Sequence, residues 1–200
     1  MAIKVANNQS LTAITSIPAS ITGGAMTLLE TKTASSDATI SFTSDIDSTY
    51  KEYIFVGIDV HPASDDNYLV FNFSADSGSN YNVTKTTTHV RVRHDEDGSD
   101  GSIEYLANQD LAQSTSDVRL TFVGNDNDQS TSFKLQLFDP SSTTFVKHFM
   151  ADGNGNEEAD RLYRSIVAGY GNTTSAVDAV QFKFASGNID SGTFKLYGIS

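Results

Sequence analysis

The chain has 200 residues, with 25 acidic against 13 basic side chains and a formal net charge of −12. This length fits one domain with a short extension, and the acidic balance repels phosphates and anionic lipids, so we expect neither nucleic-acid binding nor membrane insertion. The absence of cysteine excludes disulfide frameworks, thiolate zinc sites and a cysteine nucleophile, while 46 Ser and Thr residues indicate a turn-rich β protein.

The first 30 residues carry scattered aliphatic side chains without a period, together with Pro18 and the pair Gly23–Gly24. This pattern predicts an extended N-terminal arm, residues 1–30, followed by one folded domain, residues 31–200. We expect the arm to lie on another subunit or on a larger particle, because an unstructured segment can order on binding. No signal peptide and no transmembrane run is expected from the sequence.

Alternation with period two is strongest from Tyr53 to Val60, where the aliphatic residues share one face: Ile54, Val56, Ile58 and Val60. That face is expected to point inward, which leaves Tyr53 on the exposed side. Residues 68–73 repeat the pattern, with Leu69, Phe71 and Phe73 inward, and a turn at 74–80 follows. The two segments are predicted to be neighbouring strands.

Further alternating segments follow at 90–93, 118–122 and 133–137. In the first, the valines are expected to face the core and Arg91 and Arg93 the solvent. Residues 145–150 and 163–170 have the composition of strands but no clear alternation. Between these two segments, residues 157–164 (EEADRLYR) allow a single helical turn.

The end of the chain alternates again at 180–184 and 194–198, with a Gly-Asn turn at 187–188 between them. These residues predict a hairpin that closes the domain. In total about ten strands recur at a spacing of roughly 8–12 residues, which favours a sandwich or a barrel. The sequence therefore predicts an all-β fold, an antiparallel β-sandwich of jelly-roll type with an extended N-terminal arm.

Oxygen-rich segments are the first candidates for a metal site. Residues 95–101 gather Asp, Glu and Ser, residues 152–156 read Asp-Gly-Asn-Gly-Asn, and residues 124–128 form a third cluster. Calcium prefers such ligands, but solvated turns have the same composition, and 152–156 lacks the later residues of a calcium loop. Calcium binding at 95–101 and 152–156 is left open, and no metal ligand or cofactor residue is assigned.

Catalytic motifs are the second candidates. The four histidines, at 61, 89, 94 and 148, lack the close spacing of a zinc helix, although His89 and His94 are compatible with one hairpin edge. No Gly-x-Ser-x-Gly elbow is present, and no pair of carboxylates is singled out. We therefore predict that the chain is not an enzyme and assign no catalytic residue.

Tyrosines are the candidates for a binding surface, since they are enriched at protein interfaces. Four of them fall at positions that the alternation leaves exposed: Tyr53, Tyr81, Tyr163 and Tyr170. Each of these positions is equally compatible with a tyrosine that points inward, on a strand whose inward and outward faces are exchanged.

Three segments resemble small structural proteins of tailed bacteriophages, especially those of marine and cyanobacterial phages. They are MTLLETKTAS (26–35), the stretch 38–82 with its HPASDDNYLVFNFSADSGSNYN hairpin (61–82), and AVQFKFASGNIDSGTFKLYGIS (179–200). These motifs consist of residues typical of strands and turns, and none is catalytic. The middle of the chain, 95–170, matches only as a pattern of strands.

The resemblance implies a virion component with a jelly-roll or sandwich body, commonly trimeric, attached to tail, neck fibre or capsid. We expect a non-enzymatic virion structural protein, assembled in the host cytoplasm, that is tail- or neck-fibre-associated and takes part in host adhesion. Its expected partners are other virion proteins and its own copies in a homotrimer. A capsid decoration protein is one alternative. A module that binds host-surface glycan through loops 61–67, 95–101 and 124–130 is another.

Overall fold

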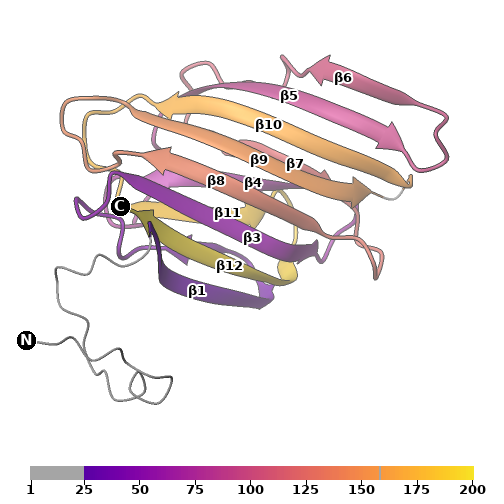
Figure 1. Cartoon of the computed structure of the whole chain (residues 1–200), viewed down its shortest axis with the longest axis horizontal. Coiled ribbons are helices and arrows are strands. Elements are labelled where there is room, and N and C mark those ends of the chain that lie inside the picture. The colour runs from indigo at the N-terminus through magenta and orange to yellow at the C-terminus, as the bar shows by residue number, and fades with distance from the viewer. Residues whose placement is uncertain (1–24, 158) are drawn as a thin grey trace, which may run out of the picture.

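The computed structural model describes residues 25–157 and 159–200, and these form two antiparallel sheets without any helix. The large sheet has eight strands in the order β1-β12-β3-β8-β9-β10-β5-β6, and the small sheet has four in the order β2-β11-β4-β7. Figure 1 looks onto the large sheet, with the small sheet behind it. The predicted all-β sandwich is confirmed.

Most successive strands lie in opposite layers, except β5–β6 and β8–β9–β10, which stay in the large sheet. Their bounds are β1 (Met26–Asp37), β2 (Ile40–Phe42), β3 (Glu52–Pro62), β4 (Asn67–Ser74), β5 (Lys85–Asp95), β6 (Gly101–Tyr105), β7 (Val118–Val123), β8 (Thr131–Phe138), β9 (Lys147–Glu157), β10 (Arg161–Gly171), β11 (Ala179–Phe184) and β12 (Ile189–Ile199). Residues 26–30, which the sequence placed in the arm, are thus the first part of β1. The rest of the predicted arm, residues 1–24, lies outside the described residues.

The pairing of eight of these strands is nested. Strand β1 pairs with β12, β2 with β11, β3 with β8, and β4 with β7. Nested pairs form one long antiparallel ribbon, and rolling it so that successive pairs fall in opposite sheets gives the Greek keys of a jelly roll. The other four strands are two insertions, β5–β6 and β9–β10, which widen the large sheet.

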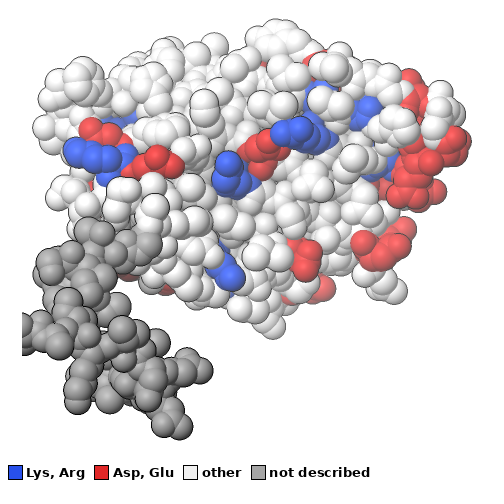
Figure 2. Space-filling model, viewed as in Figure 1, with Lys and Arg blue, Asp and Glu red and all other residues white. Residues whose placement is uncertain are grey.

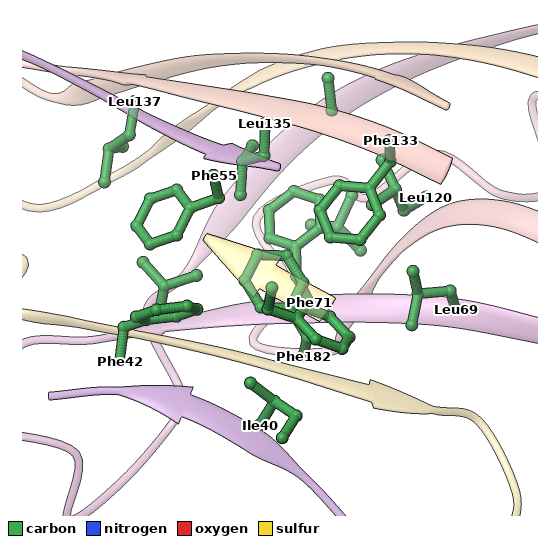
Figure 3. Close-up of a cluster of buried hydrophobic side chains, with 14 of the residues drawn as sticks. Ile40, Phe42, Phe55, Leu69, Phe71, Leu120, Phe133, Leu135, Leu137 and Phe182 are labelled. Atoms are coloured by element: carbon green, nitrogen blue, oxygen red, sulfur yellow. The ribbon is translucent and has the colours of Figure 1, made fainter. Parts of the chain in front are cut away.

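The core lies between the small sheet and strands β1, β12, β3, β8, β9 and β10 of the large sheet, and it is rich in phenylalanines (Figure 3). The Phe182 ring of β11 is at its centre, with centroids of five other rings 5.0–6.4 Å away: Phe42, Phe55, Phe71, Phe133 and Phe194. All six side chains are buried. Tilted and edge-on aromatic pairs of this kind add about 0.5–1.5 kcal/mol each beyond their area burial.

The predicted inward face of β3 is wrong for most of the strand. Tyr53 and Phe55 are buried in the core, while Ile54 and Val56 are half-buried on the opposite side. A bulge after Gly57, with Asp59 in the left-handed region (φ 50°), then changes the phase. Aspartate tolerates this conformation better than most residues. Val60 is therefore buried although it is two residues beyond the exposed Ile58.

Two predicted neighbour relations are also wrong. Strands β3 and β4 were expected to pair, as were β11 and β12, yet each pair is divided between the two sheets. The jelly-roll path explains this, because most successive strands cross from one layer to the other. Residues 157–164, for which the sequence allowed at most a single helical turn, instead contain the end of β9 at Glu157 and the start of β10 at Arg161.

Candidate functional site

The solvent-facing side of the large sheet, which we call the outer face, is unusually apolar. Cross-strand pairing aligns Asp152, Ile166, Val90 and Tyr105 in one row, and Asn154, Arg164, Val92 and Ile103 in the next. The exposed fractions are 77% for Ile103, 63% for Tyr105 and 53% for Met150, and Leu162 and Ile166 are also exposed. Figure 2 shows this face largely without charge. Contiguous apolar exposure is typical of interaction sites.

A shallow groove of about 530 Å³ runs over β5, β10 and β9 on this face. Small side chains make the hollow, since Ala168 lies between Met150 and Thr88 in the sheet register. His148 and Tyr170 lie side by side at one end, with ring centroids 6.1 Å apart. A second hollow of about 240 Å³ shares Met150 and Ala168 with the first, so the two are continuous.

A short row of charges crosses the middle of the outer face. The guanidinium of Arg164 donates two hydrogen bonds to the Asp152 carboxylate, from Nε at 3.1 Å and from Nη2 at 2.6 Å. This interaction raises the pKa of Arg164. Lys134 is the cross-strand neighbour of Asp152 on the other side. The positive and negative charges of this row nearly cancel. Burying the row against a partner would therefore cost less than burying isolated charges.

The polarity of the sheet is inverted over β5 and β6. The sequence predicted Val90 and Val92 inward and Arg91 and Arg93 outward, and the structure has the reverse: the valines share the outer face with Ile103 and Tyr105. The small sheet ends at β7, which packs against β9 and β10, so the inner side of β5 lies beyond the strands of the small sheet. Polar side chains occupy it: Lys85, Thr87 and His89 are buried, and Arg91 and Arg93 are half-buried.

The inner side of β5 and β6 holds a network of paired charges. Arg91 contacts the ring of Tyr163, with 4.6 Å from its guanidinium carbon to the ring centroid, and pairs with Glu104 at 2.6 Å. This hydrogen bond is the largest of the contributions that lower the pKa of Glu104. Arg93 pairs with Asp100 and Glu104. Ion pairs therefore hold the charged side chains of the inner side, whereas the apolar side chains Ile103 and Tyr105 of the outer side are exposed.

A smaller apolar patch lies at the opposite edge of the same sheet. Met26 and Leu28 of β1 are exposed, and Leu28 is aligned with Tyr197 of β12, which is aligned in turn with Ile54 of β3. The outer face thus has two apolar patches, one at β10-β5-β6 and one at β1. They are separated by the strands that carry the charged row.

The acidic loops gather at one end of the sandwich, on the right in Figure 2. Loops 61–67 and 124–130 are in contact, because the Asn125 amide N–H donates to Asp65 Oδ1 at 3.0 Å. Loop 95–101 contacts the β9–β10 connection through a backbone hydrogen bond from Glu96 to Asp160. Two of the three predicted glycan loops are therefore brought together directly.

The two candidate calcium segments differ in structure. In the first, Asp95 pairs with Arg161 at 2.9 Å, and Asp97 accepts a hydrogen bond from the Ser99 amide. The second, 152–156, is part of β9, where successive side chains point to opposite sides of the sheet. Across residues 25–157 and 159–200, no group of three or more His, Asp or Glu side chains is arranged to hold a metal ion.

The histidines and tyrosines are dispersed over the molecule. His89 and His94 lie on opposite sides of β5, His61 faces loop 124–130, and His148 is on the outer face. Tyr53 and Tyr163 are buried, although the alternation placed them on the exposed faces of their strands. Tyr170 lines the groove. Sequence reasoning missed Ile103, Met150 and Leu162. Met150 and Leu162 are each next to an aromatic residue on the opposite face of their strand, so the sequence does not say which side is covered, and Ile103 lies in a strand, β6, that the sequence did not predict.

The fold and the outer face define a jelly-roll sandwich with an unpartnered apolar sheet face. No protein-family model, no curated protein and no solved structure matches the chain. Within the part of the chain that the structure describes, no helix is long and apolar enough to cross a membrane.

Proposed function

We propose that this chain is a non-enzymatic structural protein of a tailed bacteriophage particle, associated with the tail or the neck fibre, and that it assembles as a homotrimer through its outer face. One observation supports assembly most directly: over β5 and β6 the sheet turns its apolar residues to solvent and its arginines inward. Apolar area exposed to water costs about 25 cal/mol per Å², and burial against a partner removes that cost.

A second copy of the chain is the partner that the charges favour. The chain as a whole carries −12, so most contacts between copies would bring acidic groups together. The middle of the outer face is different, with Lys134, Arg164 and Lys195 against Glu52 and Asp152. Copies that meet through this face keep their acidic loops at the margin, where water and salt screen them.

The placement of the two patches supports a three-fold ring over a two-fold dimer. A two-fold dimer uses one patch twice, whereas a three-fold ring needs two different patches on each subunit. The outer face offers the β10-β5-β6 patch, with Ile103 and Tyr105, and the β1 patch, with Met26 and Leu28, at opposite edges. Packing the first patch of one subunit on the second patch of the next closes a ring.

The phage context is supported by the sequence resemblance. The segments that carry it, 26–35, 38–82 and 179–200, contain most of the jelly-roll strands β1 to β4, β11 and β12. The inserted strands β5–β6 and β9–β10, which build the apolar patch, lie outside these three segments. Capsid decoration uses the same fold and is the alternative location.

A carbohydrate-binding module is the second candidate, favoured by the contact between loops 61–67 and 124–130 and by the Tyr170–His148 pair in the groove. Sugar sites combine an aromatic platform with several fixed polar groups. The groove instead is lined mainly by apolar atoms and threonines, including Met150, Ala168 and Thr88. Its chemistry suits a protein surface better.

The experiment that tests this proposal is quantitative mass spectrometry of purified particles, with this chain's copy number compared with that of the major capsid protein. A small fraction, in a multiple of three, is the expected result for a tail or neck position. Near-parity would replace the tail by capsid decoration. Absence from the particle, together with binding on a glycan array, would overturn the virion proposal in favour of the carbohydrate module.

A further inference from the structure

Two lysines on the inner side of the large sheet are completely buried, and they differ in what surrounds them. Lys85 begins β5 and Lys147 begins β9, and both are aligned with Gly171 of β10. The Lys147 ammonium donates to three backbone carbonyl oxygens, those of Ser142, Phe145 and Thr173. This is an ordinary way to satisfy a buried amine.

Lys85 has a different partner. Its Nζ is 2.6 Å from Oδ1 of Asn72, a residue of β4 that is 2% exposed, and its other hydrogen bond is to the Val83 carbonyl oxygen. A C=O bond is about 1.23 Å long, so Nζ is at most about 3.8 Å from the amide carbon of Asn72. An amine nucleophile is therefore held next to a carbonyl carbon that carries a leaving group.

The other atoms of the Asn72 amide are held as an acyl-transfer reaction requires. Its Oδ1 accepts a second hydrogen bond from the Phe73 amide N–H at 2.9 Å, a donor that stabilises negative charge on this oxygen. Its Nδ2 donates to Asp117 Oδ1 at 2.9 Å and to the Thr115 carbonyl oxygen at 3.0 Å. A carboxylate is thus in contact with the leaving nitrogen, and Lys183 holds its other oxygen at 3.0 Å.

From this geometry we infer that Lys85 and Asn72 form an intramolecular isopeptide bond, with Asp117 as the proton carrier. The Nζ–Cγ bond forms, the Cγ–Nδ2 bond breaks, and Nδ2 leaves as ammonia. Asp117 accepts one proton from Nζ and returns it to Nδ2. The reaction needs no oxidant, cofactor or second molecule.

The surroundings favour the reaction. Burial lowers the pKa of Lys85 to about 8, against the opposing effect of Asp117, so a substantial fraction of the amine is the neutral nucleophile near neutral pH. A buried ammonium that faces only two neutral oxygens is costly, and conversion to an amide removes that cost. The product joins β4 of the small sheet to β5 of the large sheet, in a chain that has no cysteine for a disulfide.

The test is the intact mass of the purified full-length chain under denaturing conditions, followed by tryptic mapping. The expected mass is lower than the sequence mass by one ammonia. There is no Lys or Arg between residues 52 and 85, so the linked form yields one peptide, 52–91, uncut at Lys85 and without backbone fragments between 72 and 85. An intact mass equal to the sequence mass overturns the inference.

Variants distinguish this bond from other ways of losing ammonia. A succinimide at Asn154–Gly155 has the same mass change, but it would persist in Lys85→Met, whereas the isopeptide bond would not. Persistence of the loss in Lys85→Met therefore contradicts the inference. Lys147→Met is the matched control and is expected to keep the bond. Asp117→Asn is expected to retain the full mass, and linkage in this variant at the wild-type rate would contradict the role of Asp117.

Discussion

Burial controls the ionisation of side chains on β5, and His89 shows it most clearly. The imidazole is buried on the inner side of the strand, and neither ring nitrogen has a hydrogen-bond partner among the described residues. Desolvation lowers the pKa of His89 to about 4, with Arg91 and Arg119 acting in the same direction and Asp110 against it. His89 is therefore neutral in the folded protein over the physiological range.

This burial makes the stability of the fold dependent on pH. As pH falls from about 6.5 to about 4, the unfolded chain binds a proton at His89 that the folded chain does not, so stability falls. Between pH 7 and pH 5 the expected loss is about 2 kcal/mol. Urea unfolding of wild type and His89→Leu at both pH values measures it, because the difference between the proteins removes the contribution of groups such as Glu157. Equal pH dependence of the two proteins would refute the assignment.

The burial of some single residues follows from the sequence, and that of others does not. The buried Leu69, Phe71 and Phe73 follow directly from alternation. Lys85 and Lys147 do not, because a lysine in a strand pattern is expected to face water and only the surrounding elements reveal its burial. The same holds for the contact of Lys85 with Asn72, which depends on how the two sheets are stacked.

At the scale of elements, the sequence predicts strands well and their partners badly. Period two identifies β3, β4, β8, β11 and β12, because each has at least one buried face. The alternation contains no information on which strands pair. Strands that follow each other in the sequence were therefore expected to pair, and this was wrong for β3–β4 and β11–β12. Bulges are the second obstacle. The extra residue of β7 relative to β4 turns Thr121 into the core, although the alternation placed it outside.

The aromatic core between the sheets gives an element-scale prediction. Replacing Phe182 of β11 by alanine removes the ring that contacts five others, and about 3–5 kcal/mol of unfolding free energy should be lost. Guanidinium unfolding followed by circular dichroism measures the loss. Phe145→Ala, at an exposed loop position, is the control and should change stability by less than about 0.5 kcal/mol. A loss below about 1 kcal/mol for Phe182→Ala would contradict the described core.

The inverted polarity of β5 has the same origin as the failed predictions of its faces. The alternation of valine and arginine shows that the two faces of β5 differ in polarity, and the usual rule assigns the apolar face to the core. The rule fails because the small sheet ends at β7, so no apolar strand of that sheet faces Arg91 and Arg93, which are half-buried in ion pairs on the inner side of β5. The candidate interface could therefore not be found from the sequence, which contains its residues but not the width of the covering sheet.

At the scale of the whole molecule, the two insertions turn a jelly roll into an asymmetric sandwich with a wide sheet on one side. The eight nested strands enclose most of the core, β9 and β10 add Phe149, Ala151 and Val167 to it, and β5–β6 extend the large sheet beyond it. The acidic loops lie at one end, and the broad face between the sheet edges is uncharged apart from a row of charges across its middle (Figure 2). The face that we propose for assembly is thus separate from the acidic loops.

The measurement that tests the outer face most directly is sedimentation velocity of the full chain over a range of micromolar concentrations, with two variants of equal added charge. Ile103→Asp places a carboxylate on the exposed edge of the apolar patch, where burial without a partner charge costs several kcal/mol. Asn127→Asp places the same charge on an exposed acidic loop. We predict a trimer for the wild type and for Asn127→Asp, and a folded monomer for Ile103→Asp. A wild-type monomer at every concentration, or a trimer that Ile103→Asp leaves intact, would contradict the outer face as the subunit interface.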